Sequence, residues 1–171
     1  QEMTIFTPEF THINRIAERI EARIVTNWFY RSLTRPGRSG INHRPFSVFW
    51  ANGSRLISSL PQRSGIGAKG AHSVEVHVDE AQDLSPQAWK EIPNTISWEK
   101  PGASWHIHGV SRGVRDDFYE YSTRPELEFH VHRITQMHRE DWSEARRQQL
   151  IEEFGGSVDS PDYKRNVKGE H

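Results

Sequence analysis

One ten-residue stretch constrains the fold most: residues 74–83 read Val-Glu-Val-His-Val-Asp-Glu-Ala-Gln-Asp. Valines at alternate positions predict a β-strand with one buried face, because successive side chains of a strand point to opposite sides. Glu75 and His77 occupy the other face, whereas central parallel strands are usually apolar on both. We therefore expect that face to be half exposed or covered by another segment. The strand ends in two adjacent acids, Asp79 and Glu80, and the carboxyl ends of strands are where α/β sheets bind ligands.

The surrounding elements predict an α/β fold with a mainly parallel sheet and one β-hairpin. Strands are expected at residues 3–7, 46–50, 55–60, 74–78, 103–108 and 129–134. Asn52-Gly53 between two β-prone runs is a strong hairpin signal. Helices are expected over the isoleucines at 13, 16, 20 and 24, from Ser85-Pro86, and from Asp141 to Gly155-Gly156. Residues 157–171 are expected to form a polar, irregular tail.

Composition excludes several classes of protein. The 171 residues include no cysteine, which rules out disulfides and cysteine zinc sites. No apolar run is long enough for a membrane span. The net charge of -1 excludes a chain that is basic throughout, although local basic patches remain. Arg15, Arg19 and Arg23 share one helical face; a solvated face is the simplest interpretation, and contact with phosphate backbones, together with Arg112 and Arg115, is the alternative.

The acidic pair suggests nucleotide hydrolysis. In nucleoside triphosphatases the first acid holds Mg²⁺ and the second polarises the attacking water. The usual partner is a phosphate-binding loop, G-x-x-x-x-G-K-[ST]. These 171 residues contain no Gly-Lys dipeptide. Residues 65–70 (GIGAKG) do not fit, because Ala71 follows where lysine is needed and the segment precedes the acidic strand.

The order of several segments resembles the large terminase subunit of tailed phages. The segments that carry the resemblance are residues 4–8 (TIFTP), 49–57 (FWANGSRLI), 67–72 (GAKGAH), 79–82 (DEAQ), 109–113 (GVSRG) with Phe118-Tyr119, and 159–170 (DSPDYKRNVKGE). The resemblance implies a partial P-loop NTPase fold of the ASCE type, with residues 79–82 as its Walker B segment. It also implies that residues 1–156 form the post-Walker A part of an ATPase domain and residues 157–171 a linker. The phosphate loop is expected upstream of Gln1 and a nuclease domain downstream of His171.

The resemblance further implies roles for four residues in an ATP-driven motor that moves double-stranded DNA into a capsid. Asp79 would hold Mg²⁺, Glu80 would be the catalytic base, and Ser111 would sense the nucleotide. Lys69 would reach the ATP of a neighbouring subunit, although a lysine cannot grip phosphate bidentately as arginine does. The implied partners are double-stranded DNA, a portal protein, the small terminase subunit and further copies in a ring, in the host cell cytoplasm.

Three other interpretations remain open. Residues 79–86 (DEAQDLSP) also resemble motif II of superfamily-1 helicases, but the next strand leads into 109–113 rather than into a Gly-Asp-x-x-Gln motif. Histidines two apart, at 106 and 108 and at 130 and 132, share strand faces and with His77 could bind Zn²⁺. A chain without a phosphate loop could also be non-enzymatic and serve only to bind partners.

Overall fold

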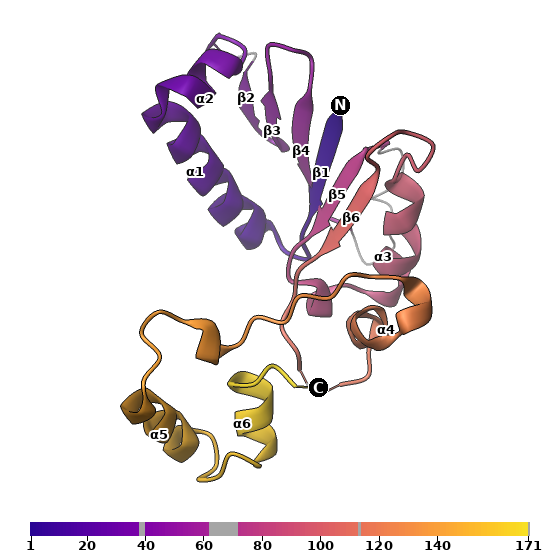
Figure 1. Ribbon diagram of the computed structural model, residues 1–171. Helices are drawn as coiled ribbons and strands as arrows, with labels where there is room; N and C mark the ends of the chain where they lie inside the picture. The colour runs from indigo at the N-terminus through magenta and orange to yellow at the C-terminus, as the bar shows by residue number, and fades with distance from the viewer. Residues whose placement is uncertain (38–39, 62–71, 113, 171) are drawn as a thin grey trace. The chain divides into compact units, whose positions relative to one another are not determined.

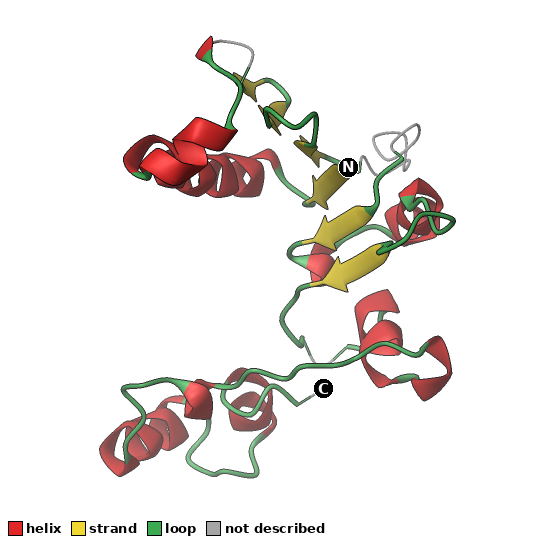
Figure 2. Ribbon diagram, turned by 45° about the horizontal axis from the view of Figure 1, so that its top comes forward, coloured by secondary structure: helices red, strands yellow, loops and turns green. Residues whose placement is uncertain are grey.

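The computed structural model describes residues 1–37, 40–61, 72–112 and 114–170. The chain forms two compact units, Gln1–His108 and Gly109–His171. In the described residues, every strand belongs to the first unit, and the second contains only helices and loops (Figure 2).

The first unit is built on a six-stranded sheet with the order β2-β3-β4-β1-β5-β6 (Figure 1). Its strands are β1 (Glu2–Phe6), β2 (Ile41–His43), β3 (Phe46–Phe49), β4 (Arg55–Ser59), β5 (Glu75–Val78) and β6 (Ser104–Ile107). β1 pairs in parallel with β4 and β5, and β5 pairs in parallel with β6. β3 is antiparallel to both β2 and β4. The prediction of a mainly parallel sheet with a hairpin is confirmed.

The hairpin between β3 and β4 turns at the predicted Asn-Gly pair. Gly53 has a φ of +85°, a conformation that glycine adopts without the steric cost of a Cβ. The Asn52 side chain accepts a hydrogen bond of 2.9 Å from the backbone N–H of Ser54.

Helices lie against both faces of this sheet. α1 (Phe10–Thr26) packs buried Ile13 and Ile24 against Phe46 and Val48 of β3, as its isoleucine spacing predicts. α2 (Trp28–Leu33) follows α1 directly. α3 (Pro86–Glu91) is capped by Ser85, whose hydroxyl accepts from the backbone N–H of Ala88 at 3.1 Å. It lies against the opposite face, where Trp89 contacts Trp105 of β6 with ring centroids 6.2 Å apart.

The second unit contains α4 (Asp117–Thr123), α5 (Glu144–Glu153) and α6 (Pro161–Asn166). α5 and α6 share a small core made of Leu150, Ile151, Tyr163 and Val167. α5 stops before Gly155, as predicted, but it begins at Glu144 rather than at Asp141, because the Ser143 hydroxyl provides its cap. Of the helices in the described residues, none is both long and apolar enough to cross a membrane.

Two expectations for the second unit are wrong. The strand predicted at residues 129–134 is irregular. Val131 is 50% exposed and Ile134 is 84% exposed, so the β-prone residues there have no packed surface to favour a strand. The predicted irregular tail, residues 157–171, contains α6. Ser160-Pro161 begins this helix with the same hydroxyl cap and first-position proline that mark α3.

Candidate functional site

Asp79 and Glu80 lie immediately beyond the carboxyl end of β5. The backbone N–H of Asp79 donates to the carbonyl of Phe6, the last residue of β1, at 2.9 Å. On the other side, the N–H of His108 donates to the carbonyl of Val78 at 2.8 Å. The acidic pair is therefore held at the carboxyl edge of the parallel strands, as predicted, and this is the edge where α/β sheets commonly bind ligands.

The backbone turns sharply at Glu80. Its φ of 51° and ψ of 46° are left-handed, which is uncommon for a residue with a side chain. A short 3-10 helix, η3 (Ala81–Asp83), follows, and the Ala81 N–H donates to the carbonyl of His108 at 2.9 Å. Because the strand ends here, the two neighbouring carboxylates are not confined to opposite faces of the sheet. A left-handed backbone at a residue with a side chain, as at Glu80, is a form of strain that is often found at functional sites.

The two carboxylates have different surroundings. Glu80 is half-buried, and its Oε2 accepts a hydrogen bond of 2.6 Å from the Gln82 side chain, which fixes its direction. Asp79 is also half-buried, and its carboxylate forms no hydrogen bond with any other described residue. Burial, followed by the proximity of His77, lowers the pKa of His108 below its usual value of 6.5, and the charge of Asp79 opposes part of that shift. An oriented carboxylate beside one without a hydrogen bond suits a hard, oxygen-seeking cation such as Mg²⁺.

The other residues singled out from the sequence belong to other parts of the chain. Ser111 belongs to the second unit, where its hydroxyl donates to the carbonyl of Glu170 at 2.9 Å. Lys69 and the segment 65–70 lie outside the described residues. Arg15, Arg19 and Arg23 are all exposed on α1, and within the described residues none of them forms an ion pair.

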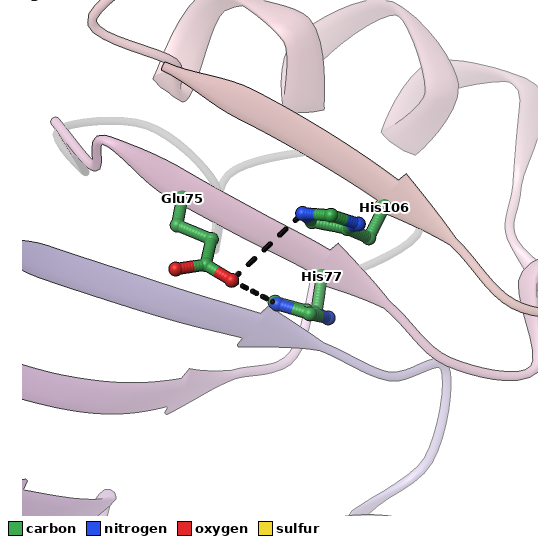
Figure 3. Close-up of side chains that lie close together, drawn as sticks. All are labelled: Glu75, His77 and His106. Carbon is green, nitrogen blue, oxygen red and sulfur yellow. Dashed lines mark hydrogen bonds and ion pairs between the residues drawn. The ribbon is translucent and has the colours of Figure 1, made fainter. Parts of the chain in front are cut away.

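A second polar group lies on one face of β5 and β6. Its members are Glu75, His77 and His106, which come from facing positions of the two strands (Figure 3). The exposed pair His130 and His132, in the second unit, has ring centroids 4.7 Å apart. Sequence reasoning singled out the histidines but missed Glu75 as their partner. The available signal was its spacing of two from His77, which places both on one face.

No protein-family model matches the chain, and no curated protein matches it. An α/β domain whose parallel strands end in an acidic pair defines a class that includes many nucleotide hydrolases. Among solved structures, the fold is similar to the large terminase ATPase domain of Thermus phage P74-26, with a TM-score of 0.65 and 15% identity. The similarity covers 99% of this chain and 76% of that one. An arginine-to-alanine mutant of the same phage domain gives a TM-score of 0.66 at the same identity and coverage. The predicted resemblance is thus confirmed at the level of the fold: the chain has the fold of a phage terminase ATPase domain.

Proposed function

We propose that this chain is the ATPase part of a viral DNA-packaging motor, which hydrolyses ATP to translocate double-stranded DNA. One observation carries the proposal: in a chain with the fold of a phage terminase ATPase domain, an Asp-Glu pair lies at the carboxyl edge of the parallel strands. The same observation favours a packaging motor over a superfamily-1 helicase.

The two acids divide the work of hydrolysis. When bound with ATP, Mg²⁺ neutralises charge on the phosphates. Asp79, whose carboxylate forms no hydrogen bond with another described residue, holds that ion. Glu80, oriented by Gln82, acts as the general base and accepts the proton of the attacking water.

Further roles follow from the resemblance. Ser111 couples the state of the nucleotide to movement of the DNA, and Lys69 reaches the ATP of the neighbouring subunit in a homo-oligomeric ring. The ring works with a portal protein and the small terminase subunit in the host cell cytoplasm. Residues 1–156 act as the part of the ATPase domain that follows the phosphate loop, and residues 157–171 act as a linker.

The sharpest test compares two glutamates of the first unit. Glu80→Gln keeps the size of the side chain and removes its basicity, so ATP turnover by the assembled motor should fall by about 10²- to 10⁴-fold while ATP binding persists. Glu99→Gln is the matched control, because Glu99 is exposed and lies away from the acidic edge on the turn before β6. Turnover that survives in Glu80→Gln would exclude Glu80 as the base.

DNA contact can be tested separately on α1. The stripe of Arg15, Arg19 and Arg23 is exposed and carries no ion pair within the described residues, so it can accept phosphate groups. If all three contact the backbone, replacing them with glutamine should reduce the slope of log K against log salt by about 2.7, because each neutralised phosphate contributes roughly 0.9. DNA affinity measured over a salt series tests this contact. An unchanged slope would show that the three arginines face solvent and do not contact DNA.

A further inference from the structure

Strand β5 and the facing part of β6 carry a compact set of side chains that are able to bind a metal ion. Glu75 and His77 alternate along β5, and His106 lies directly opposite His77 in the parallel register. Figure 3 shows all three pointing from the same face of the sheet. One potential ligand atom from each lies within 4.8 Å of the others.

Within the first unit, the face of β5 and β6 that carries these side chains is partly exposed. α1 packs against the same face of the sheet, but over β3 and β4. Leu56 of β4 packs against the α1 cluster and is in register with Met3 of β1, and Met3 is in register with Glu75 of β5. Leu56 and Glu75 therefore point to the same face. α3 lies on the opposite face, against Trp105. The side chains of Glu75, His77 and His106 are accordingly 38%, 25% and 45% exposed. An ion can therefore reach the group from solvent.

The distances between the candidate ligand atoms are close to those in a site that holds an ion. Nε2 of His77 lies 2.8 Å from Oε1 of Glu75, and Nε2 of His106 lies 3.8 Å from the same oxygen. A tetrahedral Zn²⁺ with bonds of about 2.0–2.2 Å holds its ligand atoms roughly 3.3–3.5 Å apart. The observed separations bracket that range.

The histidine rings at this site are stacked on one another. The His77 and His106 rings stack with centroids 4.5 Å apart and an interplanar angle of 14°. The His108 ring is also stacked with His77, with centroids 5.6 Å apart and an interplanar angle of 2°. Stacking holds the His77 and His106 rings side by side on neighbouring strands, each with a ring nitrogen turned toward the Glu75 carboxylate.

We propose that Glu75, His77 and His106 form a binding site for a divalent transition metal ion of the zinc class. Two imidazoles and one carboxylate suit Zn²⁺, whereas Mg²⁺ takes oxygen ligands almost exclusively. The fourth position of a tetrahedral ion is left for water. The Nδ1 atom of His77 lies 3.4 Å from Nε2 of His108, so the metal-bound ring has a second partner that fixes its orientation.

The residues of this site differ from the acidic pair, although both belong to the same stretch of chain. Counted along the strand at about 3.3 Å per residue, Glu75 is roughly 13 Å and His77 roughly 7 Å from Asp79. The ion joins β5 to β6 through side chains and stabilises the sheet, independently of any nucleotide. The inference therefore stands or falls apart from the proposed ATPase activity.

Calorimetric titration of the 171-residue chain with ZnCl₂, after dialysis against a chelator, tests the proposal. We expect one strong site per chain and an unfolding temperature that rises with Zn²⁺ concentration. His106→Gln should weaken that binding by more than the roughly 10–100-fold that loss of an outer-shell partner costs, and Glu75→Gln should do the same. Both side chains are partly exposed, so the metal-free variants should unfold at nearly the wild-type temperature.

The double variant His130→Gln/His132→Gln is the matched control, because it removes an exposed histidine pair from the second unit. It should leave the strong site intact. Binding that is weak, of variable stoichiometry and unaffected by His106→Gln would show adventitious surface binding only and overturn the proposal. Co²⁺ gives a second, spectroscopic measurement: the intense visible absorption of a four-coordinate ion should appear with the wild-type chain and be lost in His106→Gln.

Discussion

The two compact units of this chain are stabilised internally in different ways. The first unit is organised by a sheet whose strands come from distant parts of the sequence, and its central side chains, such as Phe6, Val76 and Val78, are fully buried. The second unit contains short helices and a small core around Tyr163. Helices of six to ten residues are unstable alone, so α5 and α6 depend on that core. Asp79 and Glu80 lie at the end of a strand of this sheet, where backbone hydrogen bonds to β1 and to His108 fix the chain on both sides.

The largest effect that would test this contrast is loss of the second unit's core. Tyr163 is 2% exposed and packs among Leu150, Ile151 and Val167. Tyr163→Ala should cost about 3–5 kcal/mol, the range for truncation of a buried aromatic side chain. Hydrogen exchange should show α5 and α6 opening while β1 and β5 stay protected.

A conservative Tyr163→Phe control keeps the ring and should be much less damaging. If protection of β1 and β5 fell in step with that of α5 and α6 in Tyr163→Ala, the two units would form one cooperative structure, and the contrast between them would be wrong.

A smaller effect is expected at the orienting contact of the acidic edge. Gln82→Ala removes the 2.6 Å hydrogen bond to Glu80 and leaves the base itself in place. Turnover should fall, but by less than in Glu80→Gln, because a misdirected base still acts in part of the population. Steady-state hydrolysis by the motor measures it, and Gln87→Ala on α3 is the control because its amide bonds Glu91 instead. A loss equal to that of Glu80→Gln would give Gln82 a role beyond orientation.

The smallest effect compares the two helix caps of the same type. Ser85→Ala in the first unit and Ser160→Ala in the second each remove a hydroxyl that accepts from a backbone N–H at 3.1 Å. Ser85→Ala should cost about 1 kcal/mol in thermal unfolding. Ser160→Ala should cost more, because the Ser160 hydroxyl also donates to the carbonyl of Phe154. Hydrogen exchange should place the loss in α3 for one variant and in α6 for the other. A change that spread over both units would again argue against their independence.

The same contrast explains what the sequence could predict. Alternating valines set β5 and its buried face without help from distant residues, so this strand and its terminal acids follow from local pattern alone. In the second unit, Val131 and Ile134 are β-branched residues that favour strands, but both are exposed and, in the described part of the chain, pack against nothing that would stabilise one. The strand predicted there from local sequence is therefore wrong. Local sequence did not predict α6, because residues 157–171 are mostly polar. Of residues 157–170, only Tyr163 and Val167 are buried, and they pack against α5.

The functional residues divide in a similar way. Asp79 and Glu80 are neighbours in sequence, so one strand end brings them together. Glu75 and His106 are 31 residues apart, and they meet because of the register between β5 and β6, which no local pattern specifies. The left-handed turn at Glu80 was also beyond local reasoning, since a glutamate is not a residue expected there.

The central claim is that the two adjacent acids have separate tasks, and a paired measurement of Mg²⁺-dependent ATP binding and hydrolysis tests it most directly. With the assembled motor, Glu80→Gln should bind ATP as the wild type does and fail to hydrolyse it, whereas Asp79→Ala should lose Mg²⁺-dependent binding itself. Partial recovery of Asp79→Ala at high Mg²⁺ would agree with a weakened metal site. Equal ATP affinity in both variants, or turnover that persists in Glu80→Gln, would contradict the assignment of ATP hydrolysis to this edge of the sheet.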